Sequence, residues 1–164
     1  MNKYKTEKVF KFNKESSKYL LIVESPSKCQ KIEKFLGSLY KCISSKGHLR
    51  HLDTYNDYNV QFKIIEDKQT HVKEMEKIID QYDKENIIIA SDDDREGEAI
   101  AWHICDIFSL NVNTTKRIIF NEITRTALLE SVKCPKLVNM NLVQSQIARQ
   151  VLDVIIGYKI SPYL

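Results

Sequence analysis

In the stretch IIIASDDDREGE, residues 87–98, four apolar residues and a serine precede five acidic residues within seven positions. A continuous apolar run rich in β-branched residues favours a strand that is covered on both faces. The acidic residues then follow the carboxyl end of that strand, which is where open α/β sheets bind ligands. The sequence therefore predicts a ligand site at this strand end.

Three of these acids have the spacing of a metal site. Side chains two residues apart in an extended segment point the same way, so Asp92 and Asp94 can face one point, and Glu96 can join them from the following turn. At about 4 Å and an effective dielectric of about 20, each carboxylate pair would repel by about 4 kcal/mol. Mg²⁺ relieves such repulsion and also takes phosphate oxygens. The alternative, a solvated acidic loop or helix N-terminus, fits Asp93 and Glu98.

Apolar runs alternate with segments of helical periodicity along the chain. Strands alternating with helices predict an α/β fold with a mostly parallel sheet and helices on both faces. Residues 53–60 are predicted to form a polar loop, and 61–65 an edge strand. The other predicted strands are 19–23, 41–45, 86–91 and 117–120, and the predicted helices are 26–36, 71–82, 98–109, 124–132 and 138–156.

A second part of the site is predicted at the end of strand 19–23. Glu24 closes this strand, and the Ser-Pro pair after it favours a helix start. Lys28 then lies about one helical turn from Glu24, where it can reach a phosphate. We expect Glu24 to face the same crevice as Asp92. A solvated acid and a surface lysine are the alternatives for each residue alone.

Charge and composition limit the possible partners. Of the 164 residues, 43% are hydrophobic and 29% are charged, with a net charge of +3, as in an ordinary globular protein. Residues 1–18 hold six lysines and two glutamates and are expected to form a flexible leader. No apolar run approaches the roughly 20 residues of a membrane span, so no membrane partner is expected. The four cysteines form no CxxC pair, which fits an intracellular, reducing compartment.

Other candidate sites are less specific. His48 follows a glycine and could contact phosphate. A zinc site of Cys42, His48 and His51 lacks a fourth ligand and the usual spacing. The polar face of helix 138–156, which includes Arg149 and Gln150, could touch DNA, although a hydrated face is the usual outcome. The absence of GxGxxG and P-loop motifs leaves a nucleotide cradle unsupported.

Together the motifs resemble the type IA DNA topoisomerases, in their amino-terminal Toprim domain and the first part of the next domain. The resemblance favours the bacterial topoisomerase I and reverse gyrase branch. It implies a Rossmann-like Toprim fold with a four-stranded sheet over residues 19–135, and the start of a DNA-guiding helical domain over 136–164. The matching pieces, in the family's order, are LIVESPSK (21–28), KIEKFLG (31–37), SSKGHLRHL (44–52), ASDDDREGEAIAWHI (90–104), RIIFNEIT (117–124) and LVQSQIARQVLDVIIGYKISPYL (142–164).

The resemblance also implies a role for each matching residue. Glu24 would be a general acid or base that helps to hold metal, and Lys28 would stabilise phosphate charge or protonate the leaving oxygen. Mg²⁺ would be bound by Glu24, Asp92, Asp94 and Glu96. Single-stranded or underwound DNA would be contacted by His48, Arg95, Arg149, Gln150, Asp153 and Lys159.

The implied activity is Mg²⁺-dependent cleavage and rejoining of one DNA strand, which relaxes supercoils without ATP. The family's nucleophilic tyrosine lies in a later domain, so we expect this chain to need the remaining domains and to be inactive alone. Gln150 stands where the family often carries a second arginine. The alternatives are a Toprim nuclease or primase module, and a DNA-binding module without catalysis.

Overall fold

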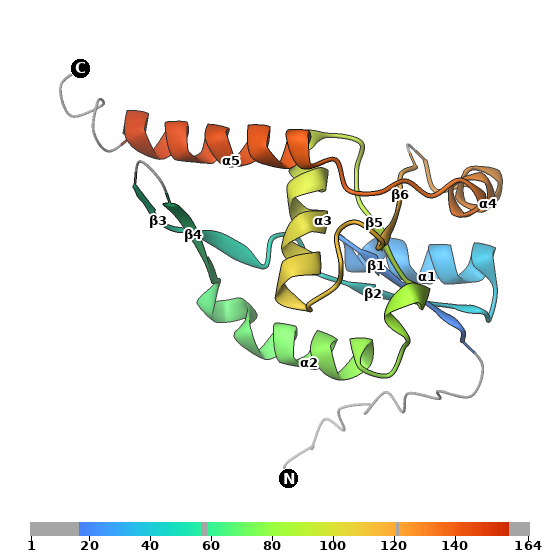
Figure 1. Cartoon of the computed structure of the whole chain (residues 1–164). Coiled ribbons are helices and arrows are strands. Elements are labelled where there is room, and N and C mark those ends of the chain that lie inside the picture. Colours follow the sequence, from blue (N-terminus) through green and yellow to red (C-terminus); the bar gives the residue numbers. More distant parts are fainter. Residues whose placement is uncertain (1–16, 57–58, 121, 158–164) are drawn as a thin grey trace, which may run out of the picture.

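A parallel four-stranded sheet organises the molecule, as the resemblance implies (Figure 1). The computed structural model describes residues 17–56, 59–120 and 122–157, so most of the predicted leader and Lys159 lie outside the described residues. The strands follow the order β2-β1-β5-β6, and each neighbouring pair is parallel. These strands are β1 (Tyr19–Val23), β2 (Tyr40–Ser44), β5 (Ile87–Ala90) and β6 (Lys116–Ile118).

Helices cover both faces of this sheet. On one face α1 and α4 share an apolar cluster with the strands, and on the other face α2 and α3 do so. The fifth helix, α5, packs against α3 (Figure 1). The bounds are α1 (Pro26–Leu36), α2 (Gln69–Ile79), α3 (Arg95–Ile107), α4 (Arg125–Lys133) and α5 (Met140–Ile155), with short 3-10 helices η1 (Glu66–Lys68) and η2 (Lys84–Asn86).

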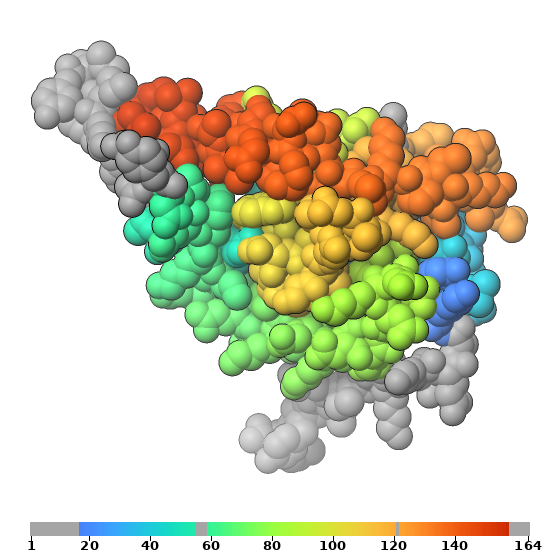
Figure 2. Space-filling view, viewed as in Figure 1, coloured from blue at the N-terminus to red at the C-terminus, as the bar shows by residue number. Residues whose placement is uncertain are grey.

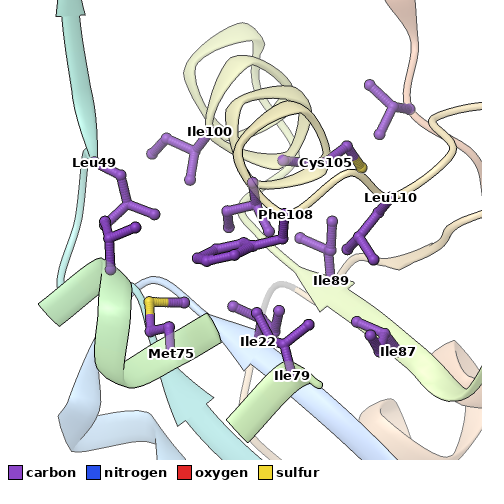
Figure 3. Close-up of a cluster of buried hydrophobic side chains, with 14 of the residues drawn as sticks. Ile22, Leu49, Met75, Ile79, Ile87, Ile89, Ile100, Cys105, Phe108 and Leu110 are labelled. Carbon is purple, nitrogen blue, oxygen red and sulfur yellow. The ribbon is translucent and has the colours of Figure 1, made fainter. Parts of the chain in front are cut away.

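The alternation of side chains along the central strands divides the core into two clusters. Leu20 and Ile22 of β1 point toward α2 and α3, whereas Leu21 and Val23 point toward α1 and α4. In the larger cluster Phe108, just after α3, lies among Ile22, Ile89 and side chains of α2 (Figure 3). Both faces of the strands are buried, which explains their continuous apolar sequences.

The predicted polar loop at 53–60 is wrong. A separate antiparallel hairpin occupies this region, formed by β3 (Arg50–Asn56) and β4 (Asn59–Ile64). The segment 61–65 therefore belongs to this hairpin and not to an edge of the main sheet. Every second residue of β4 packs against the core, whereas the others are exposed. The strand β3 was not predicted because most of its residues are polar. Its pairing with β4 does not require one fully apolar face.

Helix ends follow local capping chemistry. Gly37 ends α1 with a φ of 84°, a left-handed conformation that glycine adopts easily. Thr124 caps α4, accepting a bond from the Ala127 amide. Lys68, at the end of η1, occupies the N-cap position of α2. Thr70 therefore lies within the helix and does not cap it. Helix α3 begins at Arg95 and not at 98, and α2 ends at Ile79 and not at 82.

Helix α5 lies along the outer surface of the molecule, over α3 (Figure 2). It buries Val143 and Ile147 against the larger apolar cluster. Within the part of the chain that the structure describes, no helix combines the length and the apolar character needed to cross a membrane.

Candidate active site

The first four acidic residues lie at a tight connection between β5 and α3. Residues 91–96, which include the first two residues of α3, are here called the acidic loop. The Asp94 carboxylate caps α3, since its Oδ1 accepts a hydrogen bond of 2.7 Å from the Gly97 amide. The helix therefore begins within the acidic stretch, and Glu96 lies in its first turn. Gly97 packs directly under the loop, where an added Cβ would lie 2.3 Å from the Asp92 carbonyl oxygen. Only glycine permits this close approach.

Glu24 lies beside this loop, because β1 and β5 are neighbours and end together. Val23 pairs with Ala90 in the sheet, and the Asp92 amide donates to Glu24 Oε1 at 3.4 Å. Glu24 is half-buried, and its pKa is raised by burial and then by the negative charges of Asp92 and Asp94. The structure thus places the Glu24 carboxylate beside the backbone of Asp92, at the ends of two neighbouring strands.

Two basic side chains reach the acidic loop from other elements. Lys28 Nζ, in the first turn of α1, lies 3.3 Å from Asp92 Oδ1. His48 Nε2, just before β3, lies 2.9 Å from Glu96 Oε1. Both pairs are partly exposed, so each contributes at most about 1 kcal/mol to stability. Lys28 and His48 are therefore positioned at the acids without being locked there.

The predicted ligand set is not assembled in this structure. Asp92 faces Lys28, Asp94 caps α3 and Glu96 faces His48. These contacts use one oxygen of each carboxylate, and across the described residues no group of three or more His, Cys, Asp or Glu side chains is arranged to hold a metal. A zinc site is equally absent from this described set.

Glu98 is not solvated, contrary to the sequence interpretation. It is 4% exposed, and its Oε1 lies 3.2 Å from the Arg117 guanidinium of β6. Its other oxygen accepts a bond of 3.0 Å from the amide of Asn139, the residue that caps α5. The acidic run therefore contains one buried structural carboxylate, held inside because α3 turns that residue toward the sheet.

Arg117 was not singled out by the sequence analysis, although it supports the acidic loop directly. Its side chain is fully buried and donates to Ser91 Oγ at 3.0 Å and to the Asp92 carbonyl oxygen at 2.7 Å. Burial lowers the pKa of Arg117, and the charge of Glu98 opposes that change. The sequence signal that could have identified Arg117 is an arginine in an otherwise apolar predicted strand, because a buried charge needs a partner.

Two of the residues predicted to bind DNA, Arg95 and Arg149, line one pocket. This pocket of about 450 Å³ lies between the acidic loop and α5, and Asp94, Glu96 and Gln146 also line it. Arg149 also pairs with Asp153 at 3.6 Å along α5.

Gln150 points differently from Arg149. Its amide oxygen is buried and has no hydrogen-bond partner among the described residues. The exposed polar face of α5 toward the loop is therefore formed by Gln146 and Arg149.

The hairpin is anchored to α3 by a buried polar cluster. Arg50 Nε donates to His103 Nδ1 at 3.0 Å, and its guanidinium lies 5.3 Å from the centre of the Trp102 ring. His103 is 3% exposed, and burial followed by the charge of Arg50 lowers its pKa to about 3. Trp102 and His103 thus have packing roles.

Comparisons with known proteins agree with this geometry. A family model described as the Toprim domain matches residues 19–123. A solved structure of full-length topoisomerase I from Thermotoga maritima is 37% identical to this chain, with a TM-score of 0.76. The match covers 88% of this chain and 26% of that protein, so the chain spans about a quarter of its length.

Proposed function

Because this chain belongs to the Toprim family, we propose that it supplies the acid-base and metal-binding part of a type IA DNA topoisomerase. The resemblance seen in the sequence motifs is confirmed by the match to topoisomerase I. The proposed reaction is Mg²⁺-dependent cleavage and rejoining of one DNA strand, in an intracellular, reducing compartment. The nucleophilic tyrosine would come from one of the remaining domains.

The observation that carries this proposal is the contact between Glu24 and the acidic loop. Two parallel strand ends bring Glu24 beside the acidic loop, and burial, followed by the negative charges of Asp92 and Asp94, raises the pKa of Glu24. Lys28 approaches the same loop at 3.3 Å from Asp92. Acids beside a lysine at the carboxyl ends of strands can transfer protons and bind a phosphodiester at one place.

In the proposed reaction a tyrosine oxygen attacks the phosphorus, and the bond from phosphorus to the 3′-oxygen breaks. The tyrosine loses a proton, and the departing 3′-oxygen takes one. Glu24 is the favoured donor, because its raised pKa lets it hold a proton more readily than an ordinary glutamate. Rejoining reverses these transfers, so Glu24 then accepts the proton.

Lys28 has a different proposed role. Its ammonium lies at the end of α1 nearest the acidic loop. From there it can contact a phosphate oxygen while it stays close to Asp92. His48 and Arg95 would contact the DNA backbone on the other side of the loop, with Arg149 on α5 guiding the single strand. Asp153 would orient Arg149, with which it pairs.

The chemistry of the donor set fits Mg²⁺. Asp92, Asp94 and Glu96 offer hard oxygen donors within one loop, and Glu24 adjoins them. When bound, the ion would neutralise these carboxylates and hold phosphate oxygens in line for rejoining. Each of the three loop acids would exchange or share its present partner to bind it.

Relaxation of negatively supercoiled plasmid by a full-length protein that carries this chain tests the proposal. We expect relaxation that needs Mg²⁺ and no ATP, and a covalent link between DNA and protein after denaturation. Asp92→Asn combined with Asp94→Asn should impair rejoining, while Asp93→Asn in the same loop serves as the control. Wild-type rejoining and an unchanged Mg²⁺ response in the double variant would remove the proposed role.

The alternatives give different results in simple assays. A Toprim nuclease would nick single-stranded DNA in Mg²⁺ without a covalent protein link, and a primase would extend a nucleotide chain. A DNA-binding module without catalysis would bind single strands equally well with and without divalent cations.

A further inference from the structure

The turn that joins β2 to β3 is bonded to the backbone of Glu24. Ser44, the last residue of β2, donates from Oγ to the Glu24 carbonyl oxygen at 2.9 Å. The Gly47 amide donates to the same oxygen, also at 2.9 Å. Two donors thus fix the peptide of Glu24, the residue that directly follows β1.

Ser44 also shapes the turn itself. Its Oγ accepts a hydrogen bond of 2.9 Å from the Lys46 amide. Lys46 has a φ of 57° and Gly47 a φ of 86°, so two consecutive residues are left-handed. A lysine in this conformation is strained, and the bond to Ser44 helps to hold it there.

The outer side of the turn is held by residues near the start of α2. His71 Nε2 lies 2.8 Å from the Ser44 carbonyl oxygen, and Lys68 Nζ donates to the Lys46 carbonyl oxygen at 2.7 Å. The turn then leads directly to His48, which contacts Glu96. One turn therefore connects Glu24 on one side of the site with His48 on the other.

We propose that Ser44 is a positioning residue whose hydroxyl sets both Glu24 and His48 relative to the acidic loop. The hydroxyl acts through the Glu24 carbonyl and through the left-handed turn, and it touches neither DNA nor metal. This inference rests on the proposed function, because it assigns Ser44 to the same metal-binding site. Ser44 is 7% exposed, so no solvent molecule readily replaces its two bonds.

The neighbouring serine provides a matched control. Ser45 is fully buried, and its Oγ donates to the Val23 carbonyl oxygen at a longer 3.4 Å. It therefore bonds to the strand and not to Glu24 or Lys46. Removing either hydroxyl disturbs the packing beside β1. Only the removal of the Ser44 hydroxyl breaks the hydrogen bonds to Glu24 and Lys46.

The test measures Mn²⁺ affinity by calorimetry and amide hydrogen exchange by NMR in the 164-residue chain. We expect Ser44→Ala to weaken Mn²⁺ binding about 10-fold, in the range for residues that orient metal ligands. The Lys46 amide should exchange faster in this variant. Ser44→Thr keeps the hydroxyl and should restore both properties, whereas Ser45→Ala should leave both near wild type. If Ser44→Ala does not fold, Ser44→Cys replaces it, because a thiol keeps the size but is a weak donor.

The result that would overturn the role of Ser44 differs from the result that would overturn the proposed function. Wild-type affinity in Ser44→Ala, or an equal loss in Ser45→Ala, would overturn the positioning role while leaving the proposed function intact. Absence of Mn²⁺ binding by the wild-type chain itself would overturn the proposed function, and the role of Ser44 at the site with it.

Discussion

Arg117 and Glu98 form a buried ion pair that joins three parts of the molecule. The guanidinium lies 3.2 Å from Glu98 Oε1, and the two side chains are 0% and 5% exposed. Arg117 also holds the Asp92 carbonyl oxygen, while Glu98 accepts from the Asn139 amide at the start of α5. The acidic loop, the sheet and α5 are therefore positioned by one pair of charges.

Removing one member of this pair should destabilise the fold strongly. Glu98→Leu would leave the Arg117 charge buried without its carboxylate, and we expect the free energy of unfolding to fall by about 3–5 kcal/mol. Glu98→Leu combined with Arg117→Met should lose less, because no unpaired charge remains. Urea denaturation followed by circular dichroism measures both. Lys28→Met, which breaks an exposed pair, should cost about 1 kcal/mol or less. A double variant no more stable than Glu98→Leu would contradict this interpretation.

Gly97→Ala should be destabilising, although alanine usually stabilises a helix relative to glycine. Its Cβ would lie 2.3 Å from the Asp92 carbonyl oxygen, so either the loop or the start of α3 must move. We expect a lower melting temperature and shifted amide resonances over 91–98. Gly157→Ala is the control, since an added Cβ there meets nothing within 4 Å. Equal melting temperatures for the two variants would show that the close approach does not constrain the loop.

The buried His103 predicts loss of stability in acid. Its pKa is about 3 in the folded protein, against an ordinary 6.5, so the unfolded chain binds a proton that the folded chain refuses between these values. Stability should therefore fall as the pH drops below about 6.5, by up to about 1.4 kcal/mol per pH unit from this group.

His103→Asn isolates that contribution. Asparagine keeps an acceptor for Arg50 Nε but does not titrate, so the variant should lose less stability than wild type between pH 6.5 and 4.5. Denaturation curves at several pH values give the difference. Parallel stability profiles for the two proteins would rule out His103 as the source.

The sequence predicted the fold well where both faces of a strand are buried. The runs at 19–23 and 87–90 are continuous and apolar, so strand type, parallel pairing and the side-by-side placement of Glu24 and Asp92 could all be derived. The hairpin at 50–64 could not, because its register depends on pairing between two partly polar strands.

The site was only partly predictable for a similar reason. The residue types and the strand-end position of the acids were visible, and Lys28 and His48 do contact the acidic loop. The buried role of Glu98 was hidden, since it depends on which side of α3 faces the sheet and on Arg117, nineteen positions later. The start of α3 also required the Asp94 cap, which a pattern of apolar residues does not report.

The proposed function requires that Glu24 and the acidic loop bind a divalent cation. Paramagnetic broadening by Mn²⁺, followed in amide NMR spectra of the 164-residue chain, tests it most directly. We predict broadening centred on Glu24 and residues 92–96, reversed by excess Mg²⁺ and lost in the Asp92→Asn, Asp94→Asn double variant. Broadening elsewhere, or none at millimolar Mn²⁺, would contradict the claim.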